Sequence, residues 1–73
     1  MHRVAFVCID RFQASRAFLT GMVMEGDEPT SFGRDNEVFV GIGWRDDAAI
    51  INQKIVDLIA TRFDVDPQHV TIY

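Results

Sequence analysis

Residues 46–63, DDAAIINQKIVDLIATRF, decide the fold that the sequence predicts, because this is the longest segment with a clear helical pattern. Its apolar side chains recur every three or four residues, which places them on one face of a helix. They are Ala48, Ile51, Ile55, Leu58, Ile59 and Phe63. Asp46 and Asp47 open the segment, and acidic residues there suit an N-cap and the positive end of the helix dipole.

An apolar segment lies on each side of this predicted helix. Residues 37–44, EVFVGIGW, are typical of a strand, and residues 70–73, VTIY, predict another. Between the helix and the second strand, Asp66 and Pro67 predict a capped turn. Strand, helix and strand in this order predict a right-handed βαβ unit with parallel strands.

The N-terminal half predicts one more strand and one more helix. Residues 3–9, RVAFVCI, are almost continuously apolar, which indicates a strand that is central or buried on both faces. Asp10 is a suitable N-cap for an amphipathic helix over residues 11–20, with Gly21 just after its end. Residues 22–25 fit either a last turn or an extended piece. The polar residues 25–36 predict a long loop, a kind of segment that is often functional or mobile.

The fold class that follows is α/β, with residues 1–73 forming a single small domain. It has about three strands and two helices, and its C-terminal half is the βαβ unit.

Composition limits how so small a domain can be stabilised. The chain has 73 residues, 48% of them hydrophobic, with a single cysteine. One cysteine forms no intrachain disulfide, and His2 and His69 lack the spacing of metal ligands, so we expect neither a metal nor a cofactor. Small domains are usually stabilised by a disulfide, a bound metal or a partner subunit. With the first two excluded, association with another chain becomes the favoured expectation. A lone cysteine also favours a reducing compartment, and we expect the cytoplasm.

Charge disfavours two kinds of partner. The formal net charge is −4, and the acidic residues are concentrated after residue 23. Binding to a nucleic acid backbone needs a basic stripe, which this sequence lacks. No apolar run approaches the roughly 20 residues of a membrane helix. We therefore expect a protein partner or a second copy of the chain, and neither nucleic acid nor membrane.

No segment predicts a catalytic residue. Gly41 and Gly43 form a GxG, but Asp46 stands where the dinucleotide fingerprint has its third glycine. Cys8 falls in the middle of an apolar strand, where a thiol is inert. The residue types enriched at protein interfaces and the exposed apolar positions instead predict a partner-binding surface. Its members are Phe32, Trp44, Arg45, Ile50 and Tyr73.

Residues 38–73 resemble the strand–helix–strand repeat of the tautomerase superfamily. The resemblance rests on EVFVGIG, the helix and FDVDPQHVTIY. It implies assembly into trimers or hexamers, with a site for a small keto or enol acid at an oligomer interface. That family uses an N-terminal proline as its base. This chain begins with Met1 and His2, Met1 is expected to remain, and neither Pro29 nor Pro67 is a free amine.

The sequence thus predicts an interaction protein without catalysis of its own. It self-associates, or it binds and regulates a larger protein. The alternative is a tautomerase-like enzyme or a degenerate relative. In either case we expect the domain to complete its sheet or core with another chain.

Overall fold

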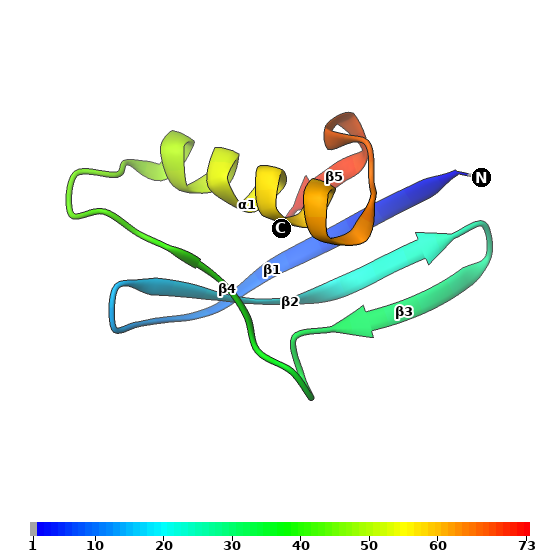
Figure 1. Cartoon of the computed structure of the whole chain (residues 1–73), viewed down its shortest axis with the longest axis horizontal. Helices are drawn as coiled ribbons and strands as arrows, with labels where there is room; N and C mark the ends of the chain where they lie inside the picture. The colour runs from blue at the N-terminus through cyan, green and yellow to red at the C-terminus, as the bar shows by residue number, and fades with distance from the viewer. Residues whose placement is uncertain (1) are drawn as a thin grey trace.

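The computed structural model describes residues 2–73 and shows one β-sheet with one helix packed on it (Figure 1). Met1, whose retention was expected, lies outside the described residues. The elements in chain order are β1 (Arg3–Gln13), β2 (Arg16–Glu25), β3 (Glu28–Phe32), β4 (Val38–Gly41), α1 (Ala48–Phe63), the 3-10 turn η1 (Pro67–His69) and β5 (Val70–Ile72). Within the described part of the chain, no helix is both long enough and apolar enough to cross a membrane.

Strand β2 organises the sheet, because it is paired along both of its edges. One edge pairs with β1 in antiparallel fashion over almost the whole strand. The other edge pairs with β4 beside its first half and with β3 beside its second half, both antiparallel. Strand β5 adds to the free edge of β1 in parallel. Strands β4 and β5 therefore run in the same direction at opposite edges of the sheet.

The predicted α/β class with two helices is wrong: the domain is β-rich and has a single helix. Residues 11–20, predicted as a helix, form the turn and the flanking strands of the β1–β2 hairpin. Ala14 and Ser15 make this turn with φ of 52° and 59°. Two successive positive φ values define the turn that matches strand twist, and it is usually made by Asn-Gly. Ala-Ser carries no such signal.

The predicted loop over residues 25–36 contains a strand. Gly26, with φ of 61°, lies in the turn between β2 and β3. Pro29 lies within β3, which pairs with β2 on one side only. Proline lacks an N–H and is tolerated at such an edge. Residues 22–25, left open between helix and strand, belong to β2.

The C-terminal half matches its prediction in the helix but not in the strand pairing. Helix α1 begins after Asp47, whose Oδ1 accepts a hydrogen bond from the N–H of Ile50 at 2.9 Å. Strand β4 ends at Gly41, three residues earlier than predicted, because the chain turns where Asp46 accepts from the N–H of Gly43 at 2.7 Å. The two strands joined by α1 are separated by β2 and β1, so they are not the adjacent pair of the predicted βαβ unit.

The core lies between α1 and one face of the sheet. Ile55 and Ile59 of the helix are fully buried, as are Val7 of β1 and Leu19 of β2. Phe32 joins them over Gly21, with its ring 4.8 Å from that of Phe63. The remaining buried apolar side chains of this layer are Ala5, Ala17, Val23, Val38, Val40 and Val65. This layer leaves the opposite face of the sheet without a covering element (Figure 1).

Candidate functional site

The uncovered face of the sheet is the candidate site, and we call it the open face. Successive side chains of a strand point to opposite faces. In β1, Ala5 and Val7 point to the helix and are fully buried, whereas Phe6 and Cys8 point to the open face. In β4, Val38 and Val40 are buried, whereas Phe39 is 40% exposed.

Apolar residues form rows across the open face. Phe6 pairs with Met22 across β1 and β2, and Val4 pairs with Met24 in the next row. Phe18 pairs with Phe39 across β2 and β4. An antiparallel sheet with one solvated face normally carries polar side chains on that face. The open face departs from this rule in these rows, although Thr20 and Ser31 also lie on it.

A hollow of about 500 Å3 lies in the middle of the open face. Phe6, Met22 and Tyr73 line it, and the Tyr73 ring is 6.0 Å from that of Phe6. Cys8 also lines the hollow and is exposed, so the burial expected from its apolar strand is wrong. Alternation along β1 explains the difference, because Cys8 follows the fully buried Val7 and points to the other side.

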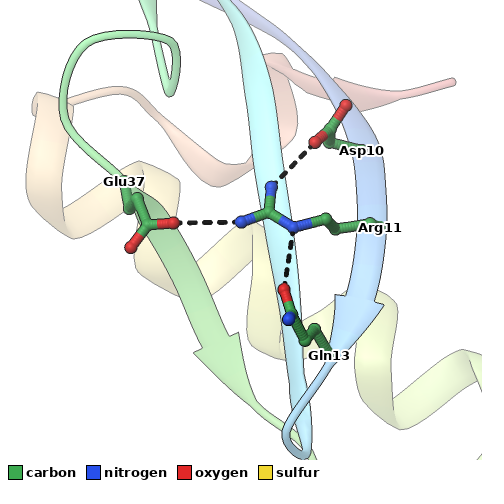
Figure 2. Close-up of polar contacts among 4 residues, drawn as sticks. All are labelled: Asp10, Arg11, Gln13 and Glu37. Carbon is green, nitrogen blue, oxygen red and sulfur yellow. Dashed lines mark hydrogen bonds and ion pairs between the residues drawn. The ribbon is translucent and has the colours of Figure 1, made fainter.

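Arg11 lies across the open face at the end where the β1–β2 hairpin turns, and Figure 2 shows its polar contacts. Its guanidinium donates to Asp10 Oδ2 at 2.9 Å, to Gln13 Oε1 at 3.2 Å and to Glu37 Oε2 at 3.0 Å. It also lies 4.0 Å from the centre of the Phe18 ring. Arg11 therefore reaches from β1 across β2 to the residue before β4, and it covers Phe18.

A second arginine lies at this end. Arg16 places its guanidinium carbon 4.6 Å from the centre of the Phe39 ring, and the Phe18 and Phe39 rings are 5.5 Å apart. Cations stack favourably on aromatic faces. In the described chain the carboxylates beside this cluster, those of Asp10 and Glu37, are paired with Arg11. The hairpin end thus combines aromatic rings with cations.

The loop that leads into α1 is held by a carboxylate. Asp46 accepts from the N–H of Gly43 and from Nζ of Lys54 on the helix. The hydrogen bond from Lys54, followed by that from Gly43, lowers the pKa of Asp46 below its usual 3.8. This carboxylate is therefore a structural anchor for the segment that carries Trp44 and Arg45.

The structure separates the residues predicted to bind a partner. Trp44 is 86% exposed, Arg45 stacks 4.4 Å from the centre of its ring, and Ile50 is exposed on the first turn of α1. Tyr73 is exposed at the other edge of the sheet. Phe32 is only 8% exposed and packs in the core near the end of α1. A helix of 16 residues is roughly 24 Å long, so Phe32 and Trp44 lie far apart.

Sequence reasoning missed the residues of the open face. The alternation of RAFLTGMV in β2 is the signal that could have found Phe18 and Met22, but the sequence predicts a helix over residues 11–20 and either a last turn or an extended piece over residues 22–25. It also missed that His2 and His69 come together where β5 pairs with the first part of β1. The rings of His2 and His69 are 4.6 Å apart, although no third metal-ligand type of side chain gathers with them among residues 2–73.

Comparison with family models, with curated proteins and with solved structures finds no match to this chain. The resemblance of residues 38–73 to the tautomerase superfamily therefore stays a prediction.

Proposed function

We propose that the protein acts by protein–protein contact, and that its open face packs against the open face of a second copy. The observation that carries this proposal is the set of apolar rows on a sheet face that no helix or strand of residues 2–73 covers. Two sheets that pack face to face interdigitate such side chains. The helices then lie on the outside of the pair, and each sheet gains a second apolar layer.

The open face has the size of a small interface. Strands β1 and β2 have 11 and 10 residues, whereas β3, β4 and β5 have 5, 4 and 3. At roughly 3.3 Å per residue and 4.8 Å between strands, the face covers about 500 Å2. This is below the roughly 800 Å2 that each partner contributes to a standard interface, so the expected pair is a small one. Since many small domains rely on an added staple, a pair of this size also supports stability.

Two of the three arginines of the open face are compatible with burial. Burying a charge is costly unless it is paired. Arg11 is paired with two carboxylates, and Arg16 is stacked on an aromatic ring. Arg34 lines the hollow and forms no ion pair within residues 2–73, so it has to stay in contact with water when the pair forms. A second copy brings the same apolar rows, so neither surface has to bury an unpaired carboxylate. An acidic partner protein could pair with the arginines of the open face, but it would also need an apolar surface to match the centre of the face.

We also propose a cytoplasmic location. Cys8 is the single cysteine of the chain, and its thiol lies exposed in the hollow of the open face. An exposed thiol is prone to oxidation and disulfide exchange outside a reducing compartment. This exposure favours the cytoplasm.

Sedimentation of the full chain over a range of concentrations tests the pairing. The wild type is expected to sediment as a dimer, and Met22→Glu as a monomer, because it places a charge in the middle of the open face. Trp44→Glu is the matched control: it alters a more exposed apolar residue outside the rows, and it should leave the dimer intact. Circular dichroism confirms that each variant is folded.

Three results would contradict the proposal. A wild type that is monomeric at 100 micromolar or above has no such interface at the affinities of stable complexes. Loss of the dimer in Trp44→Glu but not in Met22→Glu places the contact at the start of α1. A closed trimer or hexamer contradicts face-to-face pairing and supports the tautomerase-like arrangement.

A further inference from the structure

A second hollow, of about 320 Å3, lies away from the centre of the open face. It is formed where the loop after β3 meets the last turn of α1. Arg34 lines it from the loop and Arg62 from the helix, and Phe32 and Phe63 form its apolar floor. The hollow therefore combines two cations with two stacked aromatic rings, contributed by segments nearly 30 residues apart.

Neither of the two arginines forms an ion pair in the part of the chain that the structure describes. Within residues 2–73, no carboxylate oxygen lies within 4 Å of the guanidinium nitrogens of Arg34 or Arg62, whereas Arg3 and Arg11 both form ion pairs. Asp35 lines the same hollow but lies beyond this distance from both. Two arginines and one carboxylate give the lining a net positive charge in a chain whose net charge is −4. Arg62 also borders a neighbouring hollow, which is lined by Glu25, Glu28 and Asp64.

The backbone holds this site in place. Gly33 has φ of 89°, and a Cβ at this position would lie 2.1 Å from the carbonyl oxygen of Leu19 in β2. The loop is therefore packed directly against the sheet immediately before Arg34. On the other side, the Arg62 guanidinium carbon lies 5.9 Å from the centre of the Phe63 ring. Both cations thus project from ordered segments.

We propose that this hollow binds the phosphoryl group of a small molecule, with Arg34 and Arg62 holding its oxygens. Guanidinium groups match the geometry of phosphate and bind it through paired hydrogen bonds. Ser31 and Asn36 also line the hollow and supply further polar groups for the oxygens. The Phe32–Phe63 floor packs against the organic part of a phosphate monoester.

The size of the hollow limits the ligand. Small-molecule sites span about 300 to 1,000 Å3, so this hollow is at the lower end. It accommodates a phosphate with a short organic body, and it is too small for a dinucleotide. Asp35 leaves the lining with one net positive charge, which suits a single phosphoryl group rather than a polyphosphate.

Titration of the 15N-labelled protein with phenyl phosphate tests this site by NMR. The amide signals of residues 31–36 and 62–63 are expected to shift together. Arg34→Gln and Arg62→Gln should each weaken binding by about tenfold or more, as expected for the loss of a charge-assisted hydrogen bond. Arg45→Gln removes the same charge from an exposed position outside the hollow, and it should leave the affinity unchanged.

Inorganic phosphate and phenol are titrated in parallel to identify the source of the phosphoryl group. Tighter binding of phenyl phosphate than of inorganic phosphate supports a phosphate ester, and equal binding supports free phosphate. The proposal is overturned if phenol shifts the same signals as strongly as phenyl phosphate. It is also overturned if phenyl phosphate shifts nothing in these segments, or if Arg45→Gln weakens binding as much as Arg62→Gln.

Phosphate binding at the second hollow can be tested separately from the pairing proposed above. Arg34 borders both hollows, but Arg62 lies on the helix and does not line the hollow of the open face. Sedimentation of Arg62→Gln is expected to match the wild type. A dimer without phosphate binding overturns only the present proposal, and phosphate binding by a monomer overturns only the pairing.

Discussion

Replacing Gly21 with alanine is expected to destabilise the protein strongly, because the chain uses the missing side chain at this position. A Cβ at Gly21 would lie 2.1 Å from the carbonyl oxygen of Phe6 and 2.6 Å from Cζ of Phe32. The first contact is with the backbone of a paired strand, so a change of rotamer does not relieve it. The second would displace a buried ring from its place against Phe63.

The expected loss of unfolding free energy is about 3 kcal/mol. Overpacking a core costs roughly 1–3 kcal/mol and occasionally more, and a backbone contact places this site at the upper end. A chain of 73 residues has a total stability of about 4–11 kcal/mol. In a domain of this size, each kcal/mol lowers the Tm by roughly 4–8 °C, so a Tm lower by at least 10 °C is expected.

Urea unfolding at one fixed protein concentration measures the effect. Gly41→Ala is the matched control, because Gly41 is also in a strand and a Cβ there meets nothing within 4 Å. It should be neutral or stabilise by up to about 1 kcal/mol, through the reduced freedom of the unfolded chain. If the unfolding free energy of Gly21→Ala lies within 1 kcal/mol of the wild-type value, the packing of Phe32 over β2 is wrong. If Gly21→Ala leaves too little folded protein to measure, Phe32→Leu in the same background provides a second measurement, because the smaller side chain should recover part of the lost unfolding free energy.

Three further perturbations test the local contacts. Asp47→Ala removes the N-cap of α1 and should lower the unfolding free energy by about 0.5–2 kcal/mol in urea, whereas Asp57→Ala on the exposed side of the helix should change little. Arg11→Ala uncovers Phe18 and breaks a cluster whose charges are half-exposed, so a loss of about 1 kcal/mol is expected by thermal unfolding, larger than for Arg45→Ala. The lowered pKa of Asp46 means that its charged form stabilises the fold above pH 3.8 and that this contribution is lost as the pH falls below 3.8. The stability advantage of the wild type over Asp46→Asn should therefore shrink below pH 3.8 in acid titrations followed by circular dichroism, and a constant difference down to pH 2 would refute the role of Lys54.

Helix α1 and the turn after it could be predicted because their signals are local. The stripe that contains Ile55 and Ile59 has the helical period, and both residues are fully buried. Asp47 caps the helix, and Asp66 accepts from the N–H of Gln68 at 3.0 Å in the predicted turn before β5. Each of these features depends on residues within a few positions of one another, so one sequence contains the necessary information.

The β1–β2 hairpin could not be predicted because its determinants are not local. Phe12, Phe18 and Met22 satisfy a helical spacing as well as a strand spacing, so periodicity alone does not separate the two. The choice is made by pairing: β2 forms hydrogen bonds with strands on both edges. Ala14 and Ser15 accept an unusual backbone conformation because the flanking strands require it.

The candidate site was missed for the same reason. Trp44, Arg45 and Ile50 could be recognised as exposed types near one predicted helix start, and the structure does place them there. The open face, by contrast, draws its residues from β1, β2 and β4, which lie side by side only after the hairpin has formed. Phe32 was assigned to a surface because its loop is polar, but its ring fills the space above Gly21.

The composition of β1 links the sequence to the proposed pairing. Residues 4–9 are apolar at every position, a pattern found in strands that are covered on both faces. Within the chain, α1 covers only the face with Ala5 and Val7, while Phe6 and Cys8 face the open side. A strand that served a single buried face would alternate with polar residues, as solvated antiparallel sheets do. The second apolar set in β1 therefore supports the proposed pairing, because a copy of the same face is a cover that matches it in polarity.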